Sequence, residues 1–130
     1  MKEITVHCAH DKMEDVVKLV AHPKNPNEHP KKQVELLAKI IRAQGWRSPV
    51  VVSKRSGYVV AGHGRIQAAQ LLGLDSVPVN TQDFESEAEE YAHLMADNKI
   101  AEYAELQTDK VGDILEELKK VDFDLDLTGF

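Results

Sequence analysis

Short apolar runs in the first 80 residues of the chain have the patterns of strands. Near the start, apolar residues alternate with polar ones, which is typical of a half-buried strand; they are Ile4, Val6 and Cys8. Residues 50–52 and 58–61 are mostly apolar and flank a turn, so they predict a β-hairpin. Residues 76–80 predict a further strand, which we place at the edge of the sheet because Pro78 has no N–H donor.

Two helices are predicted among these strands. The first starts at Pro30, a residue that suits the first turn of a helix, and ends before Gly45. Its apolar positions recur at helical spacing; they are Val34, Leu37, Ala38 and Ile41. The second helix runs from the loop at residues 62–65 to Leu72, and Gly73 is expected to end it.

The last third of the chain is also predicted to be helical. Ser86 and Glu89 have the spacing of a capping box at a helix start. The buried stripe expected behind it consists of Ala88, Tyr91, Ala92 and Met95. Thr108 is expected to cap a further helix, whose apolar positions are Val111, Ile114, Leu115 and Leu118.

These elements predict an α+β fold, in which a small mixed sheet with helices is followed by two C-terminal helices. We expect residues 1–82 to form the core and residues 83–120 to form a helical extension packed on it. Residues 121–130, in which acidic and apolar residues alternate, are expected to be a tail or linker.

The charge of the chain is uneven. Its 130 residues have a net charge of −6. Residues 1–80 contain 12 Lys and Arg against 7 Asp and Glu, whereas residues 81–130 contain 4 against 15. The front part could therefore face a polyanion, although the acidic balance lowers the affinity for DNA. The single cysteine, Cys8, and the lack of a long apolar run predict a cytoplasmic protein with no membrane span.

Residues 61–65, Ala-Gly-His-Gly-Arg, join a predicted strand to a predicted helix. Glycines let a ligand approach the backbone closely, and the N–H groups and positive dipole end at a helix start attract anions. Arg65 has a planar guanidinium that can grip phosphate oxygens, and His63 adds another donor. From these residues alone two interpretations stay open: an anion cradle, or a tight glycine turn with an exposed arginine.

Several segments resemble, in the same order, motifs of one family. Residues 25–27 resemble its Asn-Pro-Arg loop, and residues 45–50 resemble its "G-x-x-Q-P-I" segment. Residues 61–65 are similar to its "G-E-R-R" or "G-H-x-R" phosphate loop, residues 72–79 to its "L-G…I-P-V" segment, and residues 96–100 to its "E-N-I-Q" box. Together they resemble the N-terminal domain of ParB-like proteins, in the superfamily that includes sulfiredoxin.

The resemblance implies a site for a nucleoside triphosphate, CTP or ATP, bound with Mg²⁺. The residues that it places near the phosphates are Gly62, His63, Gly64 and Arg65. Those that it places near the base are Gly45 and Ser48, where Ser48 replaces the glutamine of the family and leaves the base preference open. Those that it places near the metal are Asp97 and Asn98, whose oxygens suit a hard cation.

The resemblance leaves several functions open. The first is a nucleotide-binding module, which in one version is a slow NTPase, serving a DNA-modifying or mobile-element protein. The second is a metal-dependent ParB-like nuclease acting on DNA, and the third is a protein interaction domain with a vestigial pocket. Within the family, the sequence most resembles the ParB domains of prophages and those associated with DNA methyltransferases. The expected partners are therefore a nucleotide, DNA, a fused or associated DNA methyltransferase, and a second copy in a homodimer. Sulfiredoxin activity is not expected, because Cys8 lies outside the loop.

Overall fold

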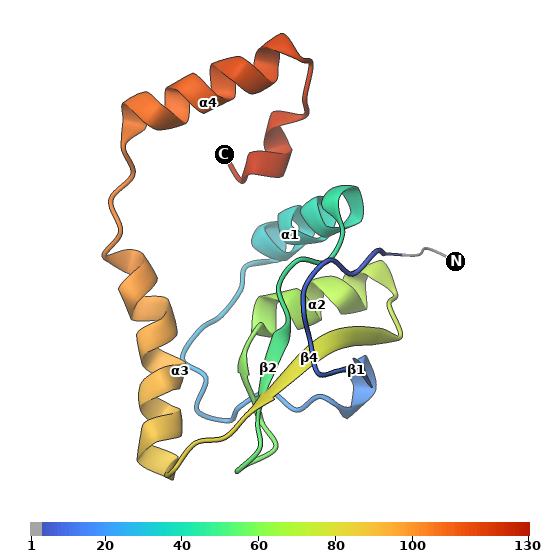
Figure 1. The fold of residues 1–130 in the computed structure, drawn as a ribbon, viewed down its shortest axis with the longest axis vertical. Coiled ribbons are helices and arrows are strands. Elements are labelled where there is room, and N and C mark those ends of the chain that lie inside the picture. The colour runs from blue at the N-terminus through green and yellow to red at the C-terminus, as the bar shows by residue number, and fades with distance from the viewer. Residues whose placement is uncertain (1–3) are drawn as a thin grey trace.

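The centre of the protein is a small mixed sheet. The computed structural model describes residues 4–130, apart from the side chains of positions 97 and 98. The strands are β1 (Lys12–Asp15), β2 (Val50–Ser53), β3 (Val59–Ala61) and β4 (Ser76–Gln82). Their order across the sheet is β1-β4-β2-β3, with β4 parallel to β2 and the other neighbours antiparallel. Together with the helices, this arrangement confirms the α+β fold (Figure 1).

Two helices pack against each other and against the sheet. They are α1 (Lys31–Gln44) and α2 (His63–Leu72). Their apolar faces form one core with residues of β2, β3 and β4. The buried members of this core include Val34, Ala38, Ile41, Val50, Val59, Ala68, Ala69, Leu72, Val77 and Val79. This core fixes the end of β3 and the start of α2 next to the N-terminal half of α1.

The first predicted strand is reduced to a single bridge. Val6 forms an isolated parallel bridge with Trp46, supported by a hydrogen bond from the Trp46 N–H to the Thr5 carbonyl. The alternation of half-buried and exposed residues is present, and Cys8 packs against the core. The regular strand β1 begins only at Lys12, where the sequence pattern predicts none, because its exposed residues show no apolar alternation.

The predicted edge position of the strand around Pro78 is wrong. Strand β4 lies inside the sheet between β1 and β2, and Pro78 is buried opposite Met13. The Val16 N–H donates to the Asp75 carbonyl, so these two residues form a hydrogen-bonded pair. Hydrogen-bonded and non-hydrogen-bonded pairs alternate along an antiparallel ladder, and Met13 and Pro78 are therefore a non-hydrogen-bonded pair. On the other side, β2 begins opposite Val79. Neither neighbour therefore requires a donor from Pro78.

The predicted buried stripe on α3 (Glu87–Glu102) is also wrong. The capping box forms as expected, with the Glu89 N–H donating to the Ser86 hydroxyl oxygen at 3.1 Å. However, the buried positions are Glu90 and Leu94, one helical turn apart, and Tyr91 is half-buried. Ala88, Ala92 and Met95 are exposed. The Glu90 carboxylate faces inward because hydrogen-bond donors from other segments surround it there. The spacing of apolar residues along the helix cannot reveal such donors.

The C-terminal residues fold back toward α1. Helix α4 (Thr108–Lys120) begins after Gln107, so Thr108 is its first residue and not its cap. Ile114 is exposed, and the other apolar positions of α4 are half-buried. A short 3-10 helix, η2 (Leu125–Thr128), then lies against α1, where the Lys39 Nζ is 3.1 Å from Asp124 and 2.8 Å from Asp126. Figure 1 shows that α4 lies away from the sheet and that η2, which follows it, contacts α1.

The division of the chain into a core, an extension and a tail remains a prediction. Within the described part of the chain, no helix is both long and apolar enough to cross a membrane.

Candidate functional site

The strand–loop–helix junction that the sequence predicts is formed. Strand β3 ends at Ala61, Gly62 adopts a left-handed conformation with φ of +98°, and α2 starts at His63. An added Cβ at Gly62 would lie 3.2 Å from the Val50 Cγ2 and 3.3 Å from its Cα. The turn therefore requires glycine, both for its backbone angle and for its close packing on β2. It directs the free N–H groups of the first turn of α2 into one place.

A pocket of about 230 Å³ opens at this junction. Its walls are the β3–α2 loop, the start of α1 and the loop before α1. The lining residues are Asn27, His29, Gln33, Val34, Leu37, Val60, Ala61, Gly62, His63, Gly64 and Arg65. None of these described lining residues is acidic, whereas several are hydrogen-bond donors. The lining thus has the composition of a site for an anion.

Arg65 supplies the positive charge of the pocket. It lies in the first turn of α2 and is half-buried. Among the residues that the structure describes, it forms no ion pair. The first residues of α2 and this cation line one pocket, which is the arrangement that an anion cradle requires.

His29 and Gln33 line the pocket and were missed by the sequence analysis. The His29 Nδ1 and the Gln33 Oε1 are 2.9 Å apart. The His29 ring also packs on Gly64, where an added Cβ would lie 3.2 Å from its Cε1 and Nδ1. Four-residue spacing at a helix start was the available signal, but polar residues at such a position are usually solvent-exposed.

His63 is held by the backbone around it. Its Nε2 accepts a hydrogen bond from the His22 main-chain N–H at 3.4 Å. Burial, followed by the charge of the nearby His29, lowers the pKa of His63 below its ordinary value, against an opposing contribution from a hydrogen bond to the Val59 backbone. The His63 ring thus has protein partners of its own, and the proposed contact of His63 with phosphate rests on its main-chain N–H at the start of α2.

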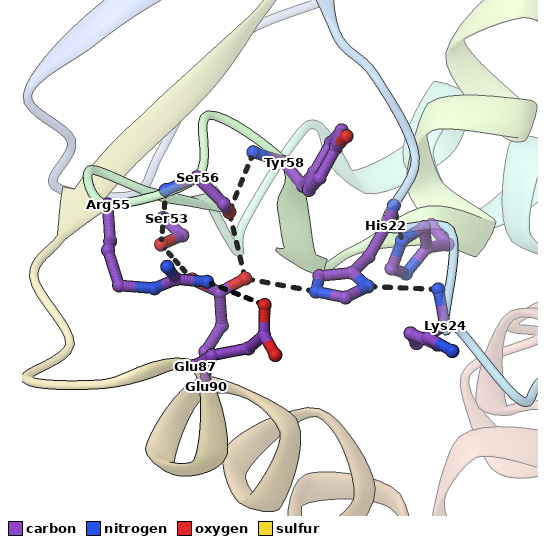
Figure 2. A network of polar contacts seen from close by, with 9 residues as sticks. His22, Lys24, Ser53, Arg55, Ser56, Tyr58, Glu87 and Glu90 are labelled. Carbon is purple, nitrogen blue, oxygen red and sulfur yellow. Dashed lines mark hydrogen bonds and ion pairs between the residues drawn. The ribbon is translucent and has the colours of Figure 1, made fainter.

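A second polar cluster lies next to the β3–α2 loop, which it contacts through His22. We call it the Glu90 cluster, and it consists of His22, Ser53, Arg55, Ser56 and Glu90. Glu90 is fully buried, and its carboxylate accepts hydrogen bonds from the Ser53 hydroxyl, from the Ser56 hydroxyl at 2.8 Å and from the His22 Nε2 at 2.9 Å. The Arg55 Nε is 3.5 Å away. Figure 2 shows these groups converging on the carboxylate from the β2–β3 turn and from the loop before α1.

The environment of Glu90 keeps it ionised. Burial is the largest single effect and would raise the pKa of Glu90. Hydrogen bonds from Ser53, Ser56 and His22, together with the charge of Arg55, outweigh it and lower the pKa below its ordinary value. A glutamate on a helix with an acidic first turn is normally assigned to the solvent-exposed face, so this cluster has no signal in the local sequence.

The candidate base-binding residues do not line the pocket. An added Cβ at Gly45 would lie 2.6 Å from the Thr5 carbonyl oxygen and 2.7 Å from the His7 ring, so the N-terminal segment covers this glycine. Gly45 instead lies in a separate groove together with Arg42 and Arg47. Ser48 is half-buried, and its carbonyl accepts a hydrogen bond from the Trp46 indole.

The candidate metal ligands belong to helix α3. The side chains of Asp97 and Asn98 lie outside the described part of the structure. Among the described residues, no group of three or more His, Cys, Asp and Glu side chains is arranged to hold a metal ion.

Sequence comparisons point to one family. The sequence model of the family described as the ParB N-terminal domain matches residues 9–98. Among curated proteins, the ParB-like nuclease domain-containing protein YnaK of Escherichia coli (strain K12) is 44% identical over 55 residues. The matched part covers 42% of this chain and 62% of YnaK, so the chain spans less than two thirds of that relative.

Comparisons with solved structures agree on the fold. The C-terminally truncated chromosome-partitioning protein ParB from Caulobacter crescentus, complexed with CTP-γ-S, has a TM-score of 0.69 at 21% identity, covering 90% of this chain and 67% of that one. The same protein complexed to the centromeric parS site has a TM-score of 0.57 at 17% identity, covering 92% and 63%. A Pnob8-like ParB-N domain has a TM-score of 0.53 at 22% identity, covering 75% and 39%.

Proposed function

We propose that this chain, which belongs to the ParB N-terminal domain family, is a module that binds a nucleoside triphosphate at the pocket of residues 62–65. The observation that supports this most directly is the junction itself, where Gly62 turns the chain so that the first residues of α2, with their N–H groups, and Arg65 share one pocket. The ParB of Caulobacter crescentus, which has this fold, was solved with CTP-γ-S, and this favours CTP as the first ligand to test.

The triphosphate is the part of the ligand that fits the pocket. Sites for drug-sized ligands have volumes of about 300–1,000 Å³, and this pocket has about 230 Å³. Main-chain N–H groups at His63 and Gly64 would bind phosphate oxygens, and Arg65 would neutralise their charge. The base would then lie outside the pocket, toward the segment that leads into Val50, which packs on Gly62. The assignment of Gly45 and Ser48 to the base remains a proposal.

A divalent cation such as Mg²⁺ would neutralise the remaining phosphate charge when it is bound. The lining of the pocket is free of carboxylates among the described residues, so the cation would be held mainly by the triphosphate itself. We keep Asp97 and Asn98, on α3, as proposed ligands to that cation. Whether the nucleotide is hydrolysed slowly is a further proposal that rests on binding.

A role on DNA is the second candidate. The relative in Escherichia coli is named a ParB-like nuclease domain-containing protein, and the Caulobacter crescentus ParB was solved on the parS site. Incubation of the chain with supercoiled plasmid and Mg²⁺ or Mn²⁺ tests for cutting, and a gel-shift titration tests for binding. Nicked plasmid that depends on the metal would favour the nuclease over the binding module. Association with a DNA methyltransferase and formation of a homodimer remain proposals as well.

Calorimetric titration tests the module directly. The chain is titrated with CTP, ATP, GTP and UTP, each with Mg²⁺ and with EDTA. The Arg65→Ala variant is expected to lose binding of whichever nucleotide the parent binds. Lys54→Ala is the matched control, because it removes the same charge from the exposed β2–β3 turn. Absence of binding for all four nucleotides would leave the vestigial-pocket interpretation.

A further inference from the structure

The Glu90 cluster reaches the phosphate loop through one residue, His22. The His22 ring donates to Glu90 on α3, and the His22 main-chain N–H donates to the Nε2 of His63, the first residue of α2. We propose that Glu90 and His22 are positioning residues that hold the phosphate loop in its binding conformation. The effect on nucleotide affinity rests on the function proposed above, but the effect on the loop does not.

The hydrogen bonds of His22 indicate which of its ring nitrogens donates and which accepts. Its Nδ1 accepts from the Lys24 main-chain N–H at 3.0 Å, so the ring proton is on Nε2, where it is donated to Glu90 (Figure 2). The ring is almost fully buried and makes edge-type contacts with the rings of Tyr58 and Tyr91, at centroid distances of 5.3 and 5.5 Å. Two bonded nitrogens and nearly complete burial restrict the orientation of the His22 ring, and the turn from which it extends is restricted with it.

The fixed main chain of His22 in turn fixes His63. Because the His63 Nε2 is an acceptor, the other ring nitrogen, Nδ1, has the proton, and the Val59 backbone interacts favourably with the protonated ring. The ring thus bridges the His22 turn and strand β3, on either side of the loop. Movement of the His22 turn would release the first residue of α2, where the N–H groups of the phosphate site begin.

A carboxylate is the only side chain that satisfies all its neighbours here. Ser53, Ser56 and His22 donate to it, and Arg55 lies beside it. Glutamine has the same shape, but its NH₂ group is a donor. Whichever way the amide is turned, a donor faces either the His22 Nε2–H or the Ser53 hydroxyl and Arg55. The Glu90→Gln substitution should therefore disturb the cluster without leaving a cavity.

The test compares Glu90→Gln with two controls. Leu94→Ala weakens the packing of the same helix at a buried position one turn away, and Glu85→Gln removes an exposed charge just before the helix. Three quantities are measured for each variant: the urea midpoint, the ¹⁵N shifts that report the His63 tautomer, and the exchange rates of the amides at residues 62–65. Affinity for CTP and ATP with Mg²⁺ is measured in parallel.

We expect Glu90→Gln to shift the His63 nitrogens, to speed amide exchange in the loop and to weaken nucleotide binding by about fivefold or more, the lower end of ordinary coupling between sites. Leu94→Ala, at equal or greater loss of stability, should leave the His63 tautomer unchanged. Equal changes in both variants, or unchanged loop exchange in Glu90→Gln, would overturn the positioning role. If Glu90→Gln does not fold, Ser56→Ala removes one donor and should give the same changes at smaller size. If the parent binds no nucleotide, the proposed function fails, while the tautomer and exchange data still decide this inference.

Discussion

A methyl group at position 64 should separate the stability of the domain from its affinity for phosphate. Gly64 lies in the first turn of α2, and its φ is not positive. Replacement of glycine by alanine in a helix stabilises it by up to about 1 kcal/mol. Against this gain, the new Cβ would lie 3.2 Å from the His29 ring, which must move by a few tenths of an ångström and take its bond to Gln33 with it. We expect the free energy of unfolding of Gly64→Ala to stay within about 1 kcal/mol of the parent.

The neighbouring glycine should behave in the opposite way. Gly62 has a φ of +98°, and a side chain in a left-handed conformation costs about 1–2 kcal/mol. The Cβ would also press on the main chain of Val50, at 3.3 Å, which cannot yield easily. Gly62→Ala should therefore lower stability by about 2 kcal/mol, at the upper end of that range.

The affinity for nucleotide should fall in both variants. In Gly64→Ala the methyl group narrows a pocket of about 230 Å³ at the wall formed by His29. We expect a loss of tenfold or more, which is about 1.4 kcal/mol. Urea unfolding gives the stability and calorimetry gives the affinity. Gly112→Ala, in α4 with no atom within 4 Å of the added Cβ, is the control for helix propensity alone. A Gly64→Ala variant with the affinity of the parent would refute the placement of the phosphates.

The titration of two buried groups, the reactivity of Cys8 and the role of Asn98 can each be tested separately. Folding lowers the pKa of His63 from 6.5, so the unfolded state takes up a proton first and stability should fall as the pH drops from about 6.5 through the lowered pKa. The urea midpoints at pH 7.5 and pH 5.5 should therefore differ less in His63→Gln than in the parent. The lowered pKa of Glu90 should add a second loss of stability below about pH 4.5, and this loss should be absent from Glu90→Gln. Cys8 packs against the core, so a thiol reagent should label the native protein more slowly than the unfolded chain. Asn98→Ala should weaken Mg²⁺-dependent nucleotide binding by about 1–3 kcal/mol and leave binding in EDTA unchanged, whereas unchanged affinity in both conditions would remove Asn98 from the metal site.

Local signals in the sequence were sufficient for the fold class and for the strand–loop–helix junction at residues 61–65. The glycine at position 62, with an apolar strand before it and a helical pattern after it, predicts the junction because each of these features acts within a few residues. The capping box at Ser86 is equally local. Such signals depend on backbone geometry that neighbouring residues decide.

Features that depend on distant partners were missed. Pro78 lies inside the sheet because the register of β1 and the starting point of β2 leave its nitrogen without a required acceptor, and neither register can be read from residues 76–80. Glu90 is buried because donors from two loops surround it, so its side chain contradicts the apolar stripe predicted for α3. His29 and Gln33 join the pocket only because α1 packs beside α2.

The central claim is that the phosphates of a nucleotide bind at residues 62–65, and a titration followed by ¹H–¹⁵N spectra tests it most directly. CTP and ATP are each added with Mg²⁺, and cytidine and adenosine serve as controls without phosphates. The largest shifts should occur at the amides of His63, Gly64 and Arg65, and they should disappear when the nucleosides replace the triphosphates. Shifts centred on the groove at Gly45, or no saturable shifts with any triphosphate, would contradict the account.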